Sequence, residues 1–337
     1  MQSVIYSEEL HQFVSVGGTS IIVSHNSIDW DLMMGKESYN FYSVAYSQYL
    51  NLFVATGSYY TESSTSGVVF VSYDCVNWSL VYRDIYEYFI SIIYSEELHL
   101  FVAVGDGGYI YVSPDGIDWT NRIFTSPHQL NSVIYSKDLH MFVIVGANVT
   151  NATNIIYTSS DGINWTHIEI ETNKTLNSVT YSEELHLFVA VGNVGVIVTS
   201  SDGINWNLES TGFTHNLMSI TYSEMLHLFV AVGSNNNTNG VILTSSDGIN
   251  WNVIPSGVYS RLQSVIYSNK LHLFLIMGFY NTILHTLFKK NENKIQNITS
   301  DSDMNLNLLI GNNSFRVIMD SGSLKCRITY RQKYIGV

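Results

Sequence analysis

The sequence predicts an all-β fold, and three features lead to that prediction: its composition, an internal repeat, and the division of each repeat into short segments. Aromatic residues are abundant, with 23 Tyr, 15 Phe and 6 Trp, whereas Pro occurs only 3 times and charged residues make up 13% of the chain. Aromatic side chains favour strands, and charged helix formers are scarce. At 337 residues the chain is long enough to bury a large core.

The repeat is marked by variants of the phrase SVxYS, each followed by a polar turn such as SEELH (residues 95–99). An apolar run that ends in glycine comes next, such as LFVAVG (residues 100–105). Successive copies are 40 to 48 residues apart, and a period in this range with several strands per unit is typical of a β-propeller blade. The seven tyrosines of the phrase are Tyr6, Tyr46, Tyr94, Tyr135, Tyr181, Tyr222 and Tyr267.

Each unit divides into four strand-like segments, which we name strands A, B, C and D. Strand B is apolar at consecutive positions, so both of its faces must be buried, as in blades stacked around an axis. A β-solenoid is the competing repeat fold, but it fits units with three hairpin-like turns poorly. We expect a seven-bladed β-propeller of four-stranded blades over residues 1–299, with blades starting near residues 2, 42, 90, 131, 177, 218 and 263. A C-terminal β-strand extension is expected over residues 300–337.

The phrase SSDGINW occurs at residues 159–165, 200–206 and 245–251, between strands C and D. In such a turn Asp accepts hydrogen bonds from backbone amides two residues ahead, and Gly adopts a positive φ. The tryptophan then starts strand D and is expected to fill the space between neighbouring blades. A functional carboxylate would have little reason to recur around a ring, so we interpret the phrase as a structural turn. The residues assigned to it are Asp74, Asp115, Asp161, Asp202, Asp247, Trp119, Trp165, Trp206 and Trp251.

These turns resemble the Asp-box, or BNR, repeat of sialidase-like propellers and of related bacterial and plastid propellers. The copy SPDGIDW (residues 113–119) and the three SSDGINW copies match it, with one residue fewer between Asp and Trp than in the usual box. Two earlier copies have drifted, with Asn26 and Ser27 replacing Asp and Gly in the first and Cys75 replacing Gly in the second. The seventh unit lacks the phrase. The resemblance implies the fold and says little about activity.

Charge and cysteine content exclude several classes of function. Residues 1–288 hold 7 basic and 24 acidic side chains, a net charge of −17, whereas residues 289–337 hold 8 basic and 4 acidic, a net charge of +4. We expect no nucleic-acid partner, because phosphate contacts need Lys and Arg. Cys75 and Cys326 form neither a disulfide pattern nor a metal-binding one, and we expect no metal or cofactor. The sequence shows no signal peptide and no bilayer-spanning apolar run, so we expect no membrane insertion.

A four-stranded blade places its A–B and C–D turns on one face of the ring, the turn face, and its B–C and D–A loops on the other, the loop face. The turn face repeats acidic residues and one histidine per unit, and histidines of adjacent blades would be too far apart to share a metal. We expect a turn-stabilising role for His11, His99, His140, His186, His227 and His272.

The loop face differs from unit to unit, and variable loops on a rigid scaffold commonly carry binding. Its tyrosine rings and asparagine amides suit a sugar ligand, although each such residue also suits a plain solvated loop. The candidate ligand-binding residues are Tyr59, Tyr60, Arg83, Tyr86, Asp106, Tyr109, Arg122, Asn148, Asn193, Asn236, Tyr259 and Arg261.

Catalysis is not supported by these candidates. A sialidase needs three convergent arginines, a Tyr–Glu pair and an acid, and the repeat region contains only Arg83, Arg122 and Arg261, outside any family motif. A glycosidase needs two facing carboxylates, and the loop carboxylates cannot be paired from sequence. We assign no catalytic residue and expect no enzyme, with a sialidase-like glycosidase kept as an alternative.

Residues 300–337 leave the repeat and turn basic. Three strand-like runs, at 305–310, 315–319 and 324–330, are separated by GNN and DSGS turns. The motif Leu-x-x-Gly-Asn-Asn (residues 308–313) followed by GSLKCRITYRQKYIGV resembles the closing strands of distal tail components of long-tailed bacteriophages. The resemblance implies a phage or prophage tail part that displays the propeller. Alternatively, these strands serve only to close the ring.

Our leading hypothesis is a non-catalytic propeller that recognises a cell-surface glycan or protein as part of a virion tail or another particle surface. Residues 300–337 would then contact other tail proteins. The alternative is a protein-assembly scaffold similar to plastid photosystem-assembly propellers, in which case we expect a soluble cytoplasmic protein.

Overall fold

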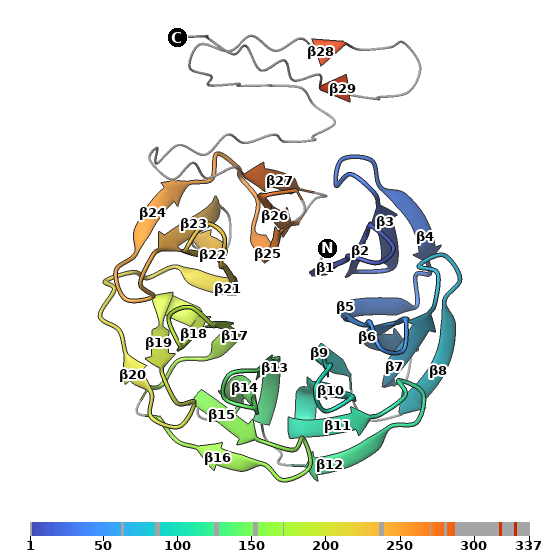
Figure 1. Ribbon diagram of the computed structural model, residues 1–337, viewed down its shortest axis with the longest axis horizontal. Coiled ribbons are helices and arrows are strands. Elements are labelled where there is room, and N and C mark those ends of the chain that lie inside the picture. Colours follow the sequence, from blue (N-terminus) through green and yellow to red (C-terminus); the bar gives the residue numbers. More distant parts are fainter. Residues whose placement is uncertain are drawn as a thin grey trace.

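The computed structural model describes residues 2–61, 64–84, 88–124, 128–150, 154–170, 172–235, 239–269, 271–279 and 282–286, together with residues 317–318 and 327–328. Seven antiparallel sheets are arranged as blades around a central axis (Figure 1). In every blade the first strand lies next to the axis and the later strands follow outward. The predicted all-β, seven-bladed propeller is therefore confirmed.

Six of the sheets have four strands, and among the described residues the seventh has three. Blade one contains β1 (Ser3–Ser7), β2 (Gln12–Gly17), β3 (Ser20–Ser24) and β4 (Asp31–Gly35). Blade two contains β5 (Tyr39–Ser47), β6 (Leu52–Tyr60), β7 (Thr65–Ser72) and β8 (Ser79–Asp84). Blade three contains β9 (Phe89–Ser95), β10 (Leu100–Gly105), β11 (Tyr109–Ser113) and β12 (Thr120–Phe124). Blade four contains β13 (His128–Ser136), β14 (Met141–Asn148), β15 (Asn154–Ser159) and β16 (Thr166–Ile168).

The remaining blades continue this order. Blade five contains β17 (Leu176–Ser182), β18 (Leu187–Gly192), β19 (Ile197–Ser200) and β20 (Asn207–Leu208). Blade six contains β21 (Asn216–Ser223), β22 (Leu228–Asn235), β23 (Asn239–Ser245) and β24 (Asn252–Pro255). Blade seven contains β25 (Leu262–Ser268), β26 (Leu273–Gly278) and β27 (Ile283–Thr286), and a separate strand pair joins β28 (Val317–Ile318) to β29 (Arg327–Ile328). The described part of the chain also contains two short 3-10 turns, η1 (Asp106–Gly108) and η2 (Asn193–Gly195).

The core consists of apolar layers between neighbouring blades. The second strand of each blade has nearly every residue buried, as its continuous apolar run predicts. In blade five, Phe188 packs between Tyr181 and Trp206, with ring centroids 4.5 and 5.9 Å away, and this cluster lies against Val143 and Val145 of blade four. The same arrangement recurs around the ring, so each blade is stabilised mainly by burial against the next.

The Ser-x-Asp-Gly turns have the geometry expected of structural turns. In the copy of blade four, Asp161 Oδ1 accepts hydrogen bonds from the backbone amides of Ile163 and Asn164 at 2.8 and 2.7 Å. Gly162 has a φ of 69°, and a Cβ built there would lie 2.6 Å from Leu100 Cδ2 of blade three. Trp165 Nε1 donates to the Gly162 carbonyl at 3.1 Å. The indole is thereby held in the turn, and the fourth strand begins one residue after the tryptophan, not at it as predicted.

Polar bonds between the inner strands were not predicted. A serine of the inner strand in blades one to six accepts a hydrogen bond from a backbone amide of the next blade, as Ser178 does from Ile220 at 3.3 Å. Six such bonds link blades one to seven in order. The matching residues of blades seven and one, Ser264 and Val4, are both described and do not form this bond. Blades seven and one meet through an apolar cluster that includes Val4 and Leu275.

Candidate functional site

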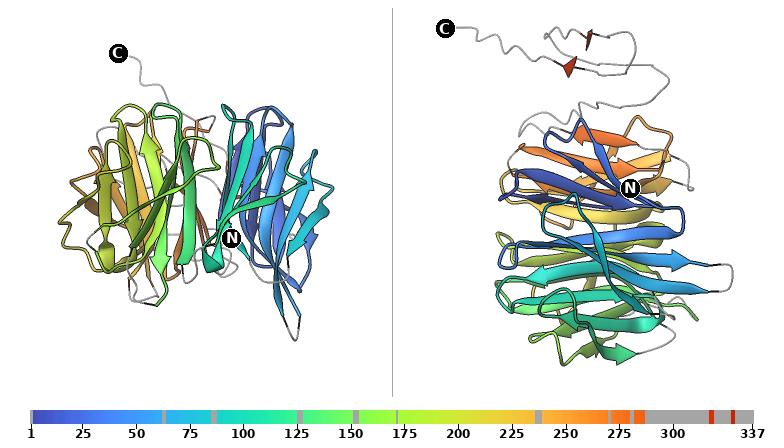
Figure 2. Two further views of the ribbon diagram at one scale, coloured as in Figure 1. Left: turned by 90° about the horizontal axis from the view of Figure 1, so that it is seen from below. Right: turned by 90° about the vertical axis from the view of Figure 1, so that its right-hand side faces the viewer.

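The loop face of the ring carries a long projecting hairpin, whereas the turn face consists of short turns. The B–C hairpin of blade two is the longest, because β6 runs to Tyr60 and β7 starts at Thr65, and Figure 2 shows it projecting beyond the other blades. Residues 57–60 and 65–67 of this hairpin are strand. The Ser-x-Asp-Gly turns and the A–B turns lie at the opposite ends of the strands and form the turn face.

The turn face uses its charges to join blades. His140 Nδ1 lies 2.6 Å from Glu97 Oε1 of the preceding blade, and Tyr135 Oη donates to Glu97 Oε2 at 3.0 Å. Burial and the neighbouring Glu97 carboxylate raise the pKa of Tyr135 to about 12. His186 and Tyr181 contact Asp138 in the same way. The six turn histidines adopt a positive φ, 48° for His140. Three of them, His140, His186 and His227, also contact a carboxylate of the preceding blade, a role that the sequence did not indicate.

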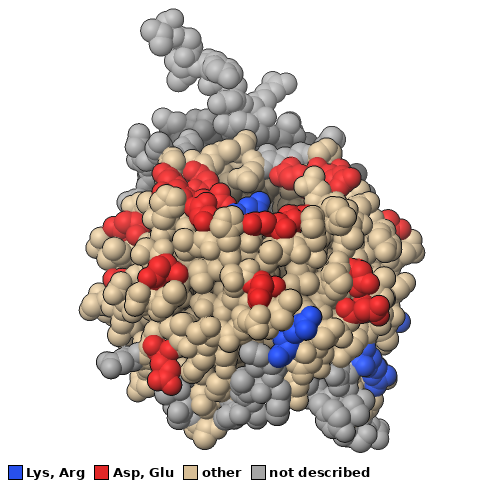
Figure 3. Space-filling view, turned by 60° about the horizontal axis from the view of Figure 1, so that its bottom comes forward, with Lys and Arg blue, Asp and Glu red and all other residues tan. Residues whose placement is uncertain are grey.

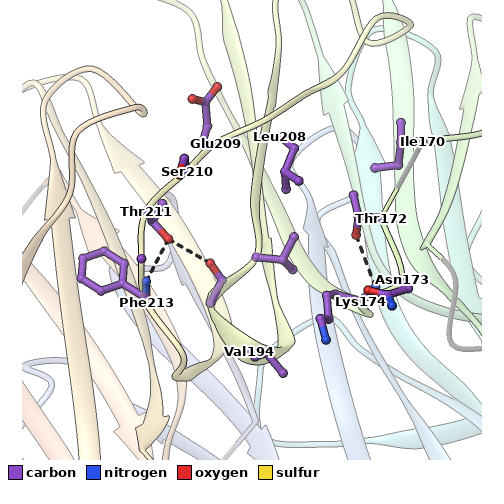
Figure 4. A pocket seen from close by; sticks show the side chains of 13 residues that line it. Ile170, Thr172, Asn173, Lys174, Val194, Leu208, Glu209, Ser210, Thr211 and Phe213 are labelled. Atoms are coloured by element: carbon purple, nitrogen blue, oxygen red, sulfur yellow. Dashed lines mark hydrogen bonds between the residues drawn. The ribbon is translucent and has the colours of Figure 1, made fainter.

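The loop face contains a groove of about 740 Å³ between blades four and five. Figure 4 shows the segment 170–174 on one side, the segment 208–213 on the other, and Val194 at the end of the loop between them. Ile170, Val194, Val196 and Leu208 give the lining aliphatic surface. The polar side chains of the lining belong to Thr172, Asn173, Lys174, Glu209, Ser210 and Thr211.

The walls of the groove are fixed by local hydrogen bonds. Thr211 Oγ1 donates to the Gly195 carbonyl at 3.2 Å, and Glu209 accepts a hydrogen bond of 2.6 Å from Thr199. The ring of Phe213 turns away from the groove (Figure 4) and packs against the core between blades five and six. The lining therefore presents aliphatic, hydroxyl, amide and charged groups and no aromatic platform.

A second cavity of about 540 Å³ follows the central axis and is lined by inner strands of all seven blades. Its lining carries no charged side chain. Asn131 donates to the Leu176 carbonyl at 2.8 Å, and Asn177 to the Leu217 carbonyl at 2.7 Å, so both amides link neighbouring blades. Burial raises the pKa of Tyr42, which also lines this channel, to about 12. The channel lining is uncharged, and the Asn131 and Asn177 amides already form hydrogen bonds within the protein, which favours a structural role.

The structure brings only some of the sequence-predicted ligand residues into contact with one another. Arg83 lies over the ring of Tyr59, with 4.1 Å from Cζ to the centroid, and Tyr59 packs against the core between blades one and two. Tyr60 is 43% exposed and its hydroxyl lies 2.9 Å from that of Tyr42. Tyr259 is 89% exposed. Tyr59 is thus covered on one side by Arg83, while Tyr60 and Tyr259 present open rings.

The other candidates are distributed over several blades. Asp106 lies in η1, with its amide donating to the Tyr88 carbonyl at 3.2 Å, and Tyr109 begins β11. Asn148 Oδ1 caps its own turn by accepting from Thr150 at 3.0 Å. Asn193 lies in η2 beside the groove and accepts a 2.9 Å bond from Asn177. Tyr86 and Asn236 lie outside the described residues.

The arginines do not form a cluster around one point. Arg83 is on the outer strand of blade two, Arg122 on the outer strand of blade three, and Arg261 at the start of blade seven, over the ring of Phe279 at 5.8 Å. Acidic side chains dominate the charged surface that Figure 3 shows. Among the described residues, no group of three His, Cys, Asp or Glu is placed to hold a metal, and no helix is long and apolar enough to cross a bilayer.

Comparison with known proteins identifies the fold but no family. No family model matches the sequence, and no curated protein does so either. Solved structures match well. The periplasmic gluconolactonase of Pseudomonas aeruginosa superposes with a TM-score of 0.62 at 7% identity, over 85% of this chain and 92% of that one.

Two further neighbours belong to different functional classes. The GH74 enzyme of Niastella koreensis has a TM-score of 0.69 at 11% identity, over 87% of this chain and 53% of that one, so this chain spans about half of its length. The WD40 β-propeller domain of Doa1 has a TM-score of 0.61 at 13% identity, over 84% of this chain and 90% of that one. Because the neighbours include both enzymes and a WD40 domain, the likeness shows the propeller fold alone.

Proposed function

We propose that this protein is a non-catalytic binding propeller whose loop face binds a cell-surface protein. The observation that carries the proposal is the groove of about 740 Å³ between blades four and five, which lies among the variable B–C and D–A loops. Grooves that combine apolar lining with a few placed polar groups are typical of binding sites. On the turn face, in contrast, His, Tyr and carboxylate groups form contacts between blades.

A protein ligand suits the groove better than a glycan does. Sugar rings bind well on aromatic faces, and the groove presents the aliphatic side chains of Ile170, Val194 and Leu208 instead. A glycan is the second candidate, favoured by the exposed rings of Tyr60 and Tyr259 elsewhere on the protein. The dispersed positions of Arg83, Arg122 and Arg261 argue against a sialidase-like reaction at one centre.

The context of this binding is also part of the proposal. The Ser-x-Asp-Gly turns support membership of the Asp-box propellers, since their carboxylates bond the turn backbone in each well-preserved copy. The tail-like motif in residues 308–337 supports attachment to a phage or prophage tail. Most of that segment lies outside the described residues, and the proposal for it rests on its sequence.

A pair of matched variants tests the proposal. Leu208, in the groove, and Ile204, in the Ser-x-Asp-Gly turn of the same blade, are 58% and 54% exposed. We expect Leu208→Asp to abolish binding of the labelled full-length chain to a panel of intact bacterial cells, and Ile204→Asp to leave it unchanged. Treating the cells with proteinase K should remove the binding, whereas periodate oxidation should not.

The outcomes separate the hypotheses. Binding that survives proteinase K but not periodate assigns a glycan ligand and overturns the protein assignment. Loss of binding with Ile204→Asp alone moves the site to the turn face. If no cell binds the chain, and one purified intracellular protein does so instead, the chain is an assembly scaffold and the cell-surface proposal is wrong.

A further inference from the structure

Val194 has a backbone conformation that its side chain disfavours. It lies in η2 with φ 57° and ψ 32°, a left-handed conformation that is costly for a β-branched residue. The equivalent loop of blade three, η1, has Gly107 at this position with φ 72°, where glycine fits without strain. Blade five therefore keeps a valine where the same turn elsewhere in the ring uses glycine.

The strained valine does not serve the loop that holds it. The loop is fixed by hydrogen bonds from two of its backbone amides. The Val194 N–H donates to the side-chain oxygen Asn216 Oδ1 at 2.9 Å, and the Asn193 N–H donates to the Thr175 carbonyl at 3.0 Å; glycine could make the first of these equally well. The isopropyl group is 46% exposed and belongs to none of the buried apolar clusters. Neither hydrogen bonding nor core packing accounts for its presence.

The side chain of Val194 lines the groove together with a cation. Lys174 belongs to the segment that pairs beside this loop, since the Asn193 amide donates to the Thr175 carbonyl, and the Lys174 amide donates to Thr172 Oγ1 at 3.3 Å. Its ammonium makes no ion pair within the described part of the chain, to which Glu171 does not belong. The carboxylate of Glu209 also lines the groove, where it accepts a hydrogen bond from Thr199. Lys174 is therefore the lining group that can pair with an anionic group of a ligand.

We propose that the groove binds an extended peptide segment in which an aliphatic side chain packs on Val194 and an adjacent carboxylate pairs with Lys174. This inference rests on the proposed function and specifies its ligand. Val194 is then a specificity-determining residue, whose local strain is tolerated because its exposed apolar surface is buried when the ligand is bound. Such storage of strain at a binding site is a known pattern, and it predicts opposite effects on stability and on affinity.

The test uses the full-length chain and a positional-scanning library of six-residue peptides. We expect the wild type to select Val, Ile or Leu next to Asp or Glu. Val194→Gly should lose the aliphatic selection, with an affinity loss of roughly tenfold, while its thermal midpoint stays equal or rises. Lys174→Gln should lose the acidic selection. Val149→Gly is the matched control, since Val149 is 58% exposed in a B–C loop outside the groove, and it should keep both selections.

Three results would overturn the inference. The wild type could show no residue preference, Val194→Gly could keep the aliphatic selection, or Val194→Gly could lower the thermal midpoint, which would make Val194 a structural residue. Failure here is distinguishable from failure of the proposed function. If Leu208→Asp still abolishes cell binding while the library selects nothing, the loop face binds a protein in another way.

Discussion

The structural reading of the Ser-x-Asp-Gly turns predicts that Asp161→Ala destabilises the fold without affecting ligand binding. The Asp161 carboxylate accepts four hydrogen bonds. Oδ1 accepts from the amides of Ile163 and Asn164 at 2.8 and 2.7 Å and from the Ser159 hydroxyl at 3.0 Å, and Oδ2 accepts from the Asn164 side chain at 2.8 Å. All four are lost in the alanine variant.

The magnitude follows from the exposure of the donors. Ile163 and Asn164 are exposed, so in the alanine variant water can accept hydrogen bonds from their amides. The free energy of unfolding should therefore fall by about 1–2 kcal/mol, as it does when a helix loses its N-cap residue. In a chain of this length that corresponds to at most about 2–4 °C in thermal midpoint per kcal/mol. Asp115→Ala should cost less, because Asp118 stands where Asn164 does and has no side-chain amide to donate.

The effect also has a defined pH dependence. Hydrogen bonds from Asn164 and Ile163 hold the pKa of Asp161 below its ordinary value of 3.8. Because the folded-state pKa lies below that of the unfolded chain, the stabilisation is complete above about pH 4 and is lost as the pH falls through the depressed value. Thermal unfolding of the wild type and of Asp161→Ala should therefore differ at pH 7 and converge on acidification below pH 4.

A functional role for the carboxylate would give the opposite pattern. If Asp161→Ala unfolds at the wild-type temperature at pH 7 but no longer binds cells, then the recurrent aspartates are ligand contacts and our reasoning about the turns fails. Equal destabilisation by Asp115→Ala and Asp161→Ala would refute the part of the argument that depends on Asn164.

Three further substitutions test the fold, each by denaturant unfolding at pH 7. Gly107→Val should lower the free energy of unfolding by roughly 1–2 kcal/mol, because it places a valine in a left-handed conformation in blade three, as Val194 is in blade five. An unchanged free energy of unfolding would contradict the strain assigned to Val194. Phe188→Ala, at a fully buried position between Tyr181 and Trp206, should cost about 3–5 kcal/mol, and a cost below about 1 kcal/mol would show that the layer between blades is not the main source of stability. Ser178→Ala should cost about 1–3 kcal/mol, because the Ile220 amide loses its acceptor, and a neutral result would mean that water in the channel replaces the hydroxyl.

The fold could be predicted because each of its signals is local and repeated. Phe188 belongs to an apolar run that both faces of the strand must bury, and Gly162 belongs to a turn of seven residues whose hydrogen bonds are all made within it. A strand period and a turn need no knowledge of distant parts of the chain. Copies of these signals around the ring then give the number of blades.

The candidate site was predicted less well, because it depends on neighbours far apart in sequence. The loops that flank the groove were predicted to be variable, but among the ligand candidates that the structure describes only Asn193 lies beside it. Tyr59 was predicted to offer its ring to a ligand, whereas in the structure Arg83 from another strand of the blade covers one face of that ring. Comparing GDGG in blade three with GNVG in blade five could have revealed Val194, since the first shows that the turn accepts glycine there.

The sequence by itself determined the strand pattern, the turn chemistry and the seven-fold repetition, since these arise from interactions within about ten residues of the chain. Only the tertiary structure decided which residues of adjacent blades meet. The bond from Ile220 to Ser178 joins residues 42 positions apart, and that from His140 to Glu97 joins residues 43 apart. Lys174 and Val194 are neighbours because β17 and β18 pair within blade five, with Leu176 opposite Gly192, but the groove that they line also needs the segments 170–172 and 208–213. Only the folded ring brings those segments to the same place, and no local pattern encodes that relation.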